Sequence, residues 1–226
     1  MIPRIPLFRF ATALAWFAVI ALGLVSLVRE YTASRIADNE QAALLQNLET
    51  LVPADRFDNN PATDAITVIA PILGDTQPVT VYRTRKSGDP VAAVLATTAP
   101  DGYGGPIRLL TAIDSNGAVL GARALSHHET PGLGDFIEAG KSNWIFEFEG
   151  RSLANTDESA WRVKRDGGAF DQFAGATVTP RAVVKAVYRA LVFFQRNRGR
   201  LFNEAPGATL RFAEVGGDAT IYRNRE

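Results

Sequence analysis

The chain begins with a long uncharged stretch. Residues 10–28 (FATALAWFAVIALGLVSLV) contain no charged side chain and lie between Arg9 and Arg29. At about 1.5 Å per residue, a helix of this length matches the hydrocarbon layer of a bilayer. The alternative is a cleaved signal peptide, whose apolar region is usually about 7–15 residues and ends at small residues. Because this run passes directly into Arg29, Glu30 and Tyr31, we predict a transmembrane helix at 10–28.

The charges beside this span give a weak signal for its orientation. Arg4 and Arg9 precede the span, whereas Arg29 and Arg35 follow it. The positive-inside rule counts Lys and Arg near the ends of a span. Together with the free amine, the N-terminal arginines favour residues 1–9 in the cytoplasm and the rest of the chain outside.

The next hydrophobic pattern has helical spacing. Leu44, Leu48 and Leu51 recur at i, i+4 and i+7, and Pro53 ends the pattern. We predict a helical connector at 29–53. It covers only a few turns, which favours packing against the following domain over a coiled coil.

Strand-like patterns then dominate, followed by one long helix. Runs rich in β-branched and apolar residues occupy 65–69, 79–84, 91–97, 107–113 and 118–125. Turn sequences such as Asn116-Gly117 separate these runs, and consecutive hairpins imply an antiparallel sheet. Val183, Val187 and Leu191 form an apolar stripe in a predicted helix from Pro180 to about Asn197. The predicted fold class is α+β, an antiparallel sheet with packed helices at 54–200, followed by a C-terminal tail at 201–226 of unassigned role.

Composition excludes several classes of function. Lys plus Arg and Asp plus Glu each number 24, so the net charge is zero. This balance does not support nucleic-acid binding, which needs clustered basic residues. The chain has no cysteine, which excludes thiolate-bound iron–sulfur clusters, zinc–thiolate sites, disulfides and thiol nucleophiles.

Two glycine-bearing segments carry candidate binding residues. Residues 101–106 (DGYGGP) place three glycines around Tyr103, as expected where backbone turns sharply or approaches a flat ligand; a plain surface loop is the alternative. Residues 127–135 (HHETPGLGD) contain the only two histidines. Adjacent side chains point to opposite sides of an extended chain, which disfavours a shared metal ion. Pro131 and Leu133 between flexible glycines better suit a loop lying against a planar ligand.

A third segment, 171–181 (DQFAGATVTPR), leads into the predicted helix. Thr179 suits the N-cap and Pro180 suits the first helical turn. Thr177 therefore precedes a helix N-terminus, whose unpaired N–H groups and dipole favour an anion. Gly175 and Ala176 leave room for a bulky group at the Thr177 hydroxyl. From these residues alone, a turn followed by a capped helix with no ligand is the favoured interpretation.

The three segments together resemble a known family. Asp171-x-x-Ala174-Gly175-Ala176-Thr177 is similar to the flavinylation motif Asp-x-x-Ser/Thr-Gly-Ala-Thr. Residues 129–134 (ETPGLG) and 102–105 (GYGG) are similar to two other signatures of the same FMN-binding domain. With the N-terminal span, their order resembles the RnfG (RsxG) family, the G subunits of Rnf ion-translocating ferredoxin:NAD oxidoreductases, over roughly residues 1–200.

The resemblance implies a cofactor, its ligands and partners. A flavin transferase would use FAD to esterify FMN through its phosphate onto Thr177, with Asp171 serving recognition by the transferase. Thr179 and the helix N-terminus would receive the phosphate, and Glu129, Thr130 and Leu133 would lie against the isoalloxazine ring. The other cofactor-binding residues would be Tyr103, Gly132, Gly175 and Ala176. The domain would face the periplasm of a bacterial inner membrane, beside membrane and cofactor-bearing subunits. No independent catalytic activity, metal site or nucleic-acid partner is expected.

One departure and two alternatives accompany this interpretation. Ala174 replaces the usual serine or threonine of the motif, which would lower the efficiency of modification if the transferase reads that hydroxyl. The C subunit of the sodium-translocating NADH:quinone reductase has the same domain and attachment. From another class of function, a non-redox periplasmic ligand-binding or assembly module would hold a small ligand noncovalently.

Overall fold

The computed structural model describes residues 10–12, 14–25, 46 and 48–212, and the chain divides into two compact units, Met1–Gln46 and Asn47–Glu226. In the first unit, residues 10–12 and 14–25 are helical, and their large apolar side chains are exposed. No helix among the described residues combines the length and apolar character needed to cross a membrane. Residues 13 and 26–28 of the predicted span lie outside the described residues, so the span at 10–28 stays a prediction.

Most of the predicted connector also lies outside the described residues. Residues 46 and 48–51 are helical, and Leu48, Leu51 and Val52 are buried. Leu51 lies close over Gly121, where an added Cβ would be 3.0 Å from a Leu51 methyl group. The described end of the connector therefore packs against its domain, as the hydrophobic stripe predicts.

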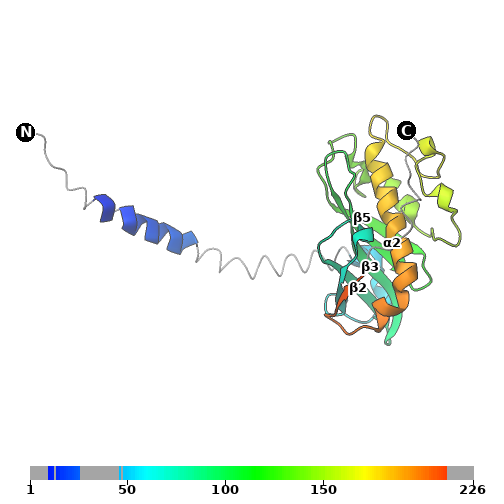
Figure 1. Ribbon diagram of the computed structural model, residues 1–226, viewed down its shortest axis with the longest axis horizontal. Coiled ribbons are helices and arrows are strands. Elements are labelled where there is room, and N and C mark those ends of the chain that lie inside the picture. The colour runs from blue at the N-terminus through cyan, green and yellow to red at the C-terminus, as the bar shows by residue number, and fades with distance from the viewer. Residues whose placement is uncertain (1–9, 13, 26–45, 47, 213–226) are drawn as a thin grey trace, which may run out of the picture. The chain divides into compact units, whose positions relative to one another are not determined.

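The second unit is built on a six-stranded sheet (Figure 1). In the order β5-β4-β3-β2-β1-β6, its strands are β5 (Val119–Ser126), β4 (Ile107–Asp114), β3 (Asp89–Ala99), β2 (Val79–Lys86), β1 (Ala65–Ile69) and β6 (Thr209–Arg211). Five of these strands match the predicted runs, and the α+β class is confirmed. All neighbouring strands are antiparallel except β1 and β6, which are parallel.

The prediction of a wholly antiparallel sheet is therefore wrong. Strand β6 comes from the tail at 201–226 and pairs with β1, with Val68 opposite Leu210. Parallel neighbours require a long crossover, and here most of the domain lies between the two strands. A three-residue strand at a sheet edge gives no recognisable alternation in the sequence, so pattern analysis missed it.

One long helix, α2 (Val178–Asn203), packs on β3 and β4 (Figure 1). It begins two residues before the predicted start and ends six residues after the predicted end. Its buried face includes Val183, Val187 and Leu191, as predicted. These side chains belong to the same core as Ala93 and Leu95 of β3. The helix therefore spans the domain from the Thr177 turn to the start of the C-terminal segment.

The long connection between β5 and α2 has a core of its own. It contains only short 3-10 helices: η3 (Asp135–Ile137), η4 (Trp144–Phe148), η5 (Glu158–Ala160) and η6 (Lys164–Asp166); η1 (Ala54–Arg56) and η2 (Pro71–Leu73) precede it in the chain. Phe148 lies 4.7 Å from Phe170 and 6.5 Å from Trp161 between ring centroids. These three side chains are fully buried. Because large aromatic rings bury much apolar area, this connection is fixed with little regular secondary structure.

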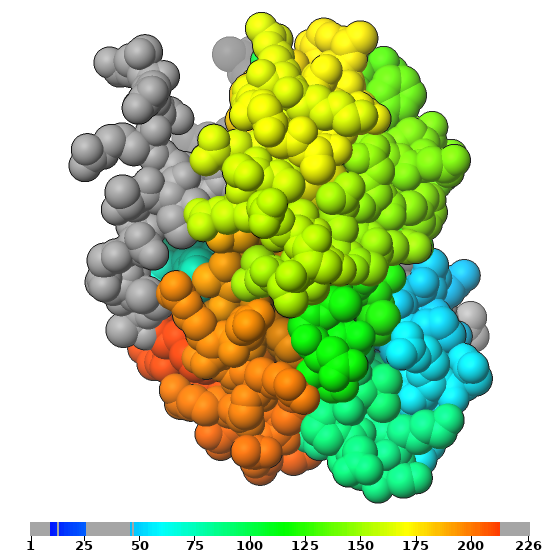
Figure 2. Space-filling view, turned by 90° about the vertical axis from the view of Figure 1, so that its right-hand side faces the viewer, coloured from blue at the N-terminus to red at the C-terminus, as the bar shows by residue number. Residues whose placement is uncertain are grey.

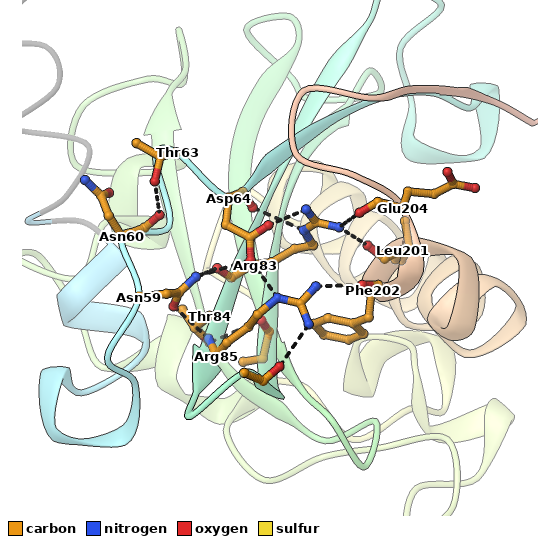
Figure 3. A network of polar contacts seen from close by, with 12 residues as sticks. Asn59, Asn60, Thr63, Asp64, Arg83, Thr84, Arg85, Leu201, Phe202 and Glu204 are labelled. Atoms are coloured by element: carbon orange, nitrogen blue, oxygen red, sulfur yellow. Dashed lines mark hydrogen bonds and ion pairs between the residues drawn. The ribbon is translucent and has the colours of Figure 1, made fainter.

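The C-terminal end of α2 is held by a buried arginine of β2 (Figure 3). The Arg83 guanidinium is fully buried; it donates to the carbonyl oxygens of Leu201 at 3.0 Å and Glu204 at 2.6 Å, and pairs with the Asp64 carboxylate. Carbonyl groups in the last turn of a helix have no intrahelical donor. Arg83 satisfies them from another element, which fixes the end of α2 against the sheet.

Arg85 extends this cluster towards the surface (Figure 3). Its Nε lies 2.7 Å from Asp64 Oδ2, and it donates to the Phe202 carbonyl oxygen at 2.6 Å. One carboxylate thus accepts from two arginines that together bond three carbonyls near the end of α2. This cap explains why the helix continues past the predicted end at Asn197. Side-chain periodicity alone could not reveal where the helix ends.

We predict that Arg83→Met lowers the free energy of unfolding by about 3–5 kcal/mol, because two buried carbonyls and part of the Asp64 carboxylate lose their donor. Urea titration followed by circular dichroism measures this change. Arg108→Met, at an exposed position on β4, is the control and should stay within about 0.5 kcal/mol. Equal, small effects of the two substitutions would contradict the role given to Arg83.

Candidate functional site

The three glycine-bearing segments of the sequence meet at the N-terminal end of α2. Gly104 of the first segment donates its N–H to Oε1 of Glu129 in the second, at 3.0 Å. Thr179, in the first turn of α2, donates its hydroxyl to Oε2 of the same carboxylate. Glu129 is only 5% exposed and Thr179 is fully buried. A single buried carboxylate therefore bonds the loop at 102–105 and the helix start to the loop at 129–134.

This arrangement corrects the predicted N-cap. The cap residue of α2 is Thr177, and Thr179 occupies the second helical position. The Thr179 hydroxyl bonds Glu129 instead of capping a backbone N–H. Glu129 acts as a buried acceptor beneath the loops, which explains why a threonine is buried at this point of the helix.

Close backbone packing at this junction requires glycine. An added Cβ on Gly134 would lie 2.8 Å from Glu129 Oε2 and 2.9 Å from Thr179 Oγ1. On Gly104 it would lie 1.9 Å from the His128 carbonyl oxygen. Both glycines therefore permit contact between segments, which the sequence alone could express only as flexible or close-packed backbone.

The loop at 130–134 is held by its own hydrogen bonds. Leu133 and Gly134 both donate their N–H to the Thr130 carbonyl oxygen at 3.1 Å. Gly132 donates to Oδ1 of Asp135 at 2.8 Å. The Lys141 ammonium, 2.8 Å from Asp135 Oδ2, together with the Gly132 N–H, holds the pKa of Asp135 below its ordinary value against the opposing effect of burial. Asp135 is therefore ionised at neutral pH and fixes the loop.

The turn that precedes Thr177 lies beside this loop. Ala176 donates to the Phe173 carbonyl oxygen at 3.1 Å, and Gly175 has φ +78°, as the third residue of a type II turn requires. A Cβ on Gly175 would be 3.7 Å from a Leu133 methyl group. The loop at 129–134 and the turn before Thr177 are therefore close to each other at Leu133 and Gly175, in addition to the bond between Glu129 and Thr179.

Packed aromatic rings support this turn. The Phe173 ring packs edge-on against Trp144 and Phe136, with centroid distances of 5.2 and 5.7 Å. Trp144 Nε1 also donates to the Asp171 carbonyl oxygen at 2.7 Å. The backbone before Thr177 is thus fixed at two points, which presents the threonine in one position.

Asp171 itself points outward. Its carboxylate is 57% exposed and lies 2.5 Å from the Lys164 ammonium. The hydrogen bond to Asp171 holds the pKa of Lys164 above its ordinary value. The Asp171 backbone N–H approaches Glu147 Oε2 at 3.4 Å. The pKa of Glu147 is raised chiefly by burial. Sequence analysis missed Lys164 and Glu147, because both lie outside the motif and only folding brings them to it.

Thr177 combines partial exposure with a helix N-terminus. It is half-buried, and exposed Val178 follows it as the first residue of α2. Among the described residues, no acceptor pairs with the N–H of Val178 or Thr179, as expected for the first turn of a helix. Free N–H groups and the positive end of the dipole make this a site suited to a phosphate.

Each of the three segments carries an exposed apolar side chain. Tyr103, Leu133 and Val178 are 73, 43 and 41% exposed, from one segment each. Val178 was not among the predicted site residues, although its place beside Thr177 in the sequence could have indicated it. Exposed apolar groups beside an anion site suit a ligand with a phosphate and a flat aromatic body.

The two histidines do not share a ligand. His127 Nε2 lies 3.1 Å from Glu138 Oε1, and its Nδ1 accepts the Glu129 N–H at 3.2 Å. His128 is exposed. Within the described residues there is no group of three or more His, Asp or Glu side chains arranged to hold a metal ion. His127 therefore contributes to the position of Glu129.

We predict that Gly134→Ala destabilises the domain by about 1–3 kcal/mol, because the new methyl group overlaps the Glu129 and Thr179 oxygens. Gly140→Ala is the matched control, since no atom lies within 4 Å of its added Cβ. Urea unfolding curves of the two variants test this. Equal stability of the two variants would show that the Glu129–Thr179 contact tolerates a side chain at 134.

Comparison with known proteins agrees with these features. Residues 102–192 match the family described as FMN-binding domain, and residues 1–51 match the RnfG N-terminal region. The G subunit of the ion-translocating oxidoreductase complex of Pseudomonas aeruginosa is 46% identical over 207 residues, covering 90% of this chain and 97% of the relative. The proteins of the same name from Yersinia pestis and Vibrio cholerae are 48 and 43% identical, covering 83 and 84% of this chain and 90 and 91% of theirs. The chain therefore belongs to the family formed by the G subunits of ion-translocating oxidoreductase complexes.

Proposed function

We propose that this chain is the FMN-carrying electron-transfer subunit of an Rnf-type ion-translocating ferredoxin:NAD oxidoreductase, with the flavin attached through a phosphoester to Thr177. The observation that carries the proposal is the convergence of three segments around a half-buried threonine at a helix N-terminus. The match to the FMN-binding domain spans all three segments. Bound FMN supplies redox chemistry that no amino-acid side chain of this site can perform.

The residues at the site fit both ends of this cofactor. The N–H groups of Val178 and Thr179 and the dipole of α2 would stabilise the phosphate. Gly175 and Ala176 leave space beside the Thr177 hydroxyl, because one lacks a side chain and the other is small. Tyr103, Gly132 and Leu133, with Thr130, would provide the surface for the flat ring.

Glu129 would contribute from beneath the site. Its carboxylate is occupied by Gly104 and Thr179, so its role is to hold the loops that contact the ring. Thr179 would then receive the phosphate through its backbone N–H, because its hydroxyl is buried and already donated. The sequence predicted that the side chains of Glu129 and Thr179 contact the cofactor directly; the proposal changes this to support by the Glu129 side chain and a backbone contact by Thr179.

Attachment requires one balanced transfer, carried out by a flavin transferase. The Thr177 oxygen forms an ester bond to the FMN phosphorus of FAD, the pyrophosphate bond breaks, AMP leaves, and the hydroxyl proton passes to a base. Exposed Asp171 on the adjacent turn suits recognition by such an enzyme, and Lys164 would fix its orientation. The bond at the phosphate leaves the ring free of any covalent change, so hydrogen bonds and burial set its potential.

The chain relays electrons and is not expected to catalyse a reaction by itself. The Thr179 hydroxyl is bonded to Glu129 but is fully buried, so a substrate cannot reach it, and Glu129 and His127 are engaged in positioning bonds. Ion translocation would belong to the complex of membrane and cofactor-bearing subunits, because the predicted span contains no charged residue.

We predict that Thr177→Val abolishes covalent flavin. Valine keeps the shape of threonine but removes the oxygen that forms the ester. The variant and the wild-type protein would be produced with the flavin transferase, denatured, and compared by flavin fluorescence in a gel. Wild-type protein should fluoresce and Thr177→Val should not.

Thr179→Val is the matched control for this experiment. It should keep covalent flavin and lose about 1–3 kcal/mol of stability, because Glu129 loses a donor. Colourless wild-type protein in the presence of the transferase would refute covalent attachment. Fluorescence retained in folded Thr177→Val but absent from folded Thr179→Val would move the attachment to residue 179.

We further propose that the N-terminal segment anchors the chain in a bacterial inner membrane, with residues 1–9 in the cytoplasm and the flavin domain in the periplasm. The described helical residues at 10–12 and 14–25 expose large apolar side chains, including Phe10, Trp16 and Ile20. Such surface is unfavourable in water and favourable in lipid. Assembly with the membrane subunits of a complex would require such an anchor.

This anchor predicts that the full-length chain remains in membranes extracted with alkaline carbonate, whereas a secreted form lacking residues 1–28 is released. In spheroplasts, added protease should degrade the flavin domain of the full-length chain. Release of the full-length chain by carbonate would refute the anchor. Protection from protease in intact spheroplasts, lost on lysis, would reverse the proposed orientation.

A further inference from the structure

A second candidate binding site lies near the opposite end of α2. A surface cleft of about 200 Å³ is lined by Ile72, Phe193, Arg196, Asn197, Arg200, Arg211 and Phe212. In Figure 2, the orange surface of the C-terminal part of α2 borders the red surface of the segment around residue 210. Eighteen helical residues separate Val178 from Arg196, about 27 Å at the helical rise. An occupant of this cleft would therefore leave the Thr177 site free.

The floor of the cleft is aromatic and fixed. The rings of Phe193 and Phe212 meet edge to face with centroids 5.0 Å apart. The Arg200 guanidinium lies 4.8 Å from the centroid of Phe212, and the Phe212 N–H donates to the Ile69 carbonyl oxygen at 2.9 Å. Stacking on a ring holds a guanidinium in one orientation while its N–H groups stay available.

The cleft carries uncompensated positive charge. Arg196 and Arg200 are one helical turn apart on α2, and Arg211 lies on β6; all three are exposed. Across the described part of the chain, none of the three forms an ion pair with a carboxylate, whereas Arg181 and Lys185 on the same helix do. Three guanidinium groups that line one cleft and pair with none of the described carboxylates favour an anionic partner.

We propose that this cleft binds the carboxylate side chains of an acidic, extended segment of another subunit of the complex. Guanidinium groups bind carboxylates through paired hydrogen bonds, and the rings of Phe193 and Phe212 would pack against the apolar stems of the acidic side chains. The cleft is too small for a helix of about 10 Å diameter but admits one or two side chains. A protein segment is favoured because the relatives are named as subunits of a complex.

The test compares two variants of the full-length chain. Arg196→Gln combined with Arg200→Gln removes the charge from the cleft, while Arg198→Gln removes one charge from an exposed position on the same helix that does not line it. Each tagged chain would be produced with the other subunits and purified in mild detergent. The double variant should recover at least about tenfold less of the partner subunits, as expected when charge-assisted hydrogen bonds are lost. Arg198→Gln should recover wild-type amounts.

A direct binding measurement identifies the partner chemistry. Hexaglutamate should bind the purified full-length wild-type chain, bind the double variant at least about tenfold more weakly, and dissociate as salt rises. Unchanged recovery of subunits by the double variant would overturn the proposal. So would binding of phosphatidylglycerol vesicles through these arginines without binding of hexaglutamate. Much tighter peptide binding after removal of residues 213–226 would show instead that the chain's own tail is the occupant.

This inference rests on the proposed function as a complex subunit, and flavin content separates the two. The double variant should keep wild-type covalent flavin fluorescence, because the cleft lies far from Thr177, and should remain folded as judged by its circular dichroism spectrum. Absence of flavin from the wild-type chain would refute the proposed attachment of FMN to Thr177. Loss of partner subunits from a fully flavinylated double variant would support the binding role of the cleft independently of the flavin.

Discussion

The buried carboxylate of Glu129 is the interaction on which the site depends. It accepts from Gly104 on one side and from Thr179 on the other, and the bond from Thr179 is buried. A buried carboxyl group that lost either donor would be left partly unsatisfied, which is costly. The two bonds therefore hold the three segments together. Thr177 keeps its place at the start of α2 because Thr179, in the first turn of the helix, is bonded to the loop beneath it.

Helix α2 connects this junction to the rest of the domain. Its N-terminal end supplies the N–H groups beside Thr177, its apolar face packs on β3 and β4, and its C-terminal carbonyls are held by Arg83 and Arg85. An electron-transfer protein benefits from such rigidity, because the cofactor's position relative to its partners must be constant. Both ends of α2 are fixed by buried polar groups, so the helix cannot shift along the sheet without breaking them.

Much of the fold could be predicted from the sequence because its signals are local. Runs of β-branched and apolar residues located β1 to β5, and the spacing of Val183, Val187 and Leu191 located α2. Strand β6 could not be predicted, because it has only three residues and is stabilised by β1, far away in the chain. The end of α2 was underestimated for the same reason: the arginines that satisfy its carbonyls belong to β2.

At the site, the sequence by itself determined the residue types and their order: glycines around Tyr103, the loop at 129–134, and Thr177 ahead of a helix. Which of them touch was decided by the tertiary structure alone. A glycine in a sequence indicates conformational freedom of the backbone or close packing against another segment, but not which segment. The close packing of Gly134 against Glu129 and Thr179 therefore became visible only in the fold. Thr179 is a residue type common at N-caps, where its hydroxyl would accept from a backbone N–H, yet in the fold this hydroxyl donates to a buried carboxylate fifty residues earlier. Local rules fix local geometry, whereas partners distant in sequence are chosen by packing.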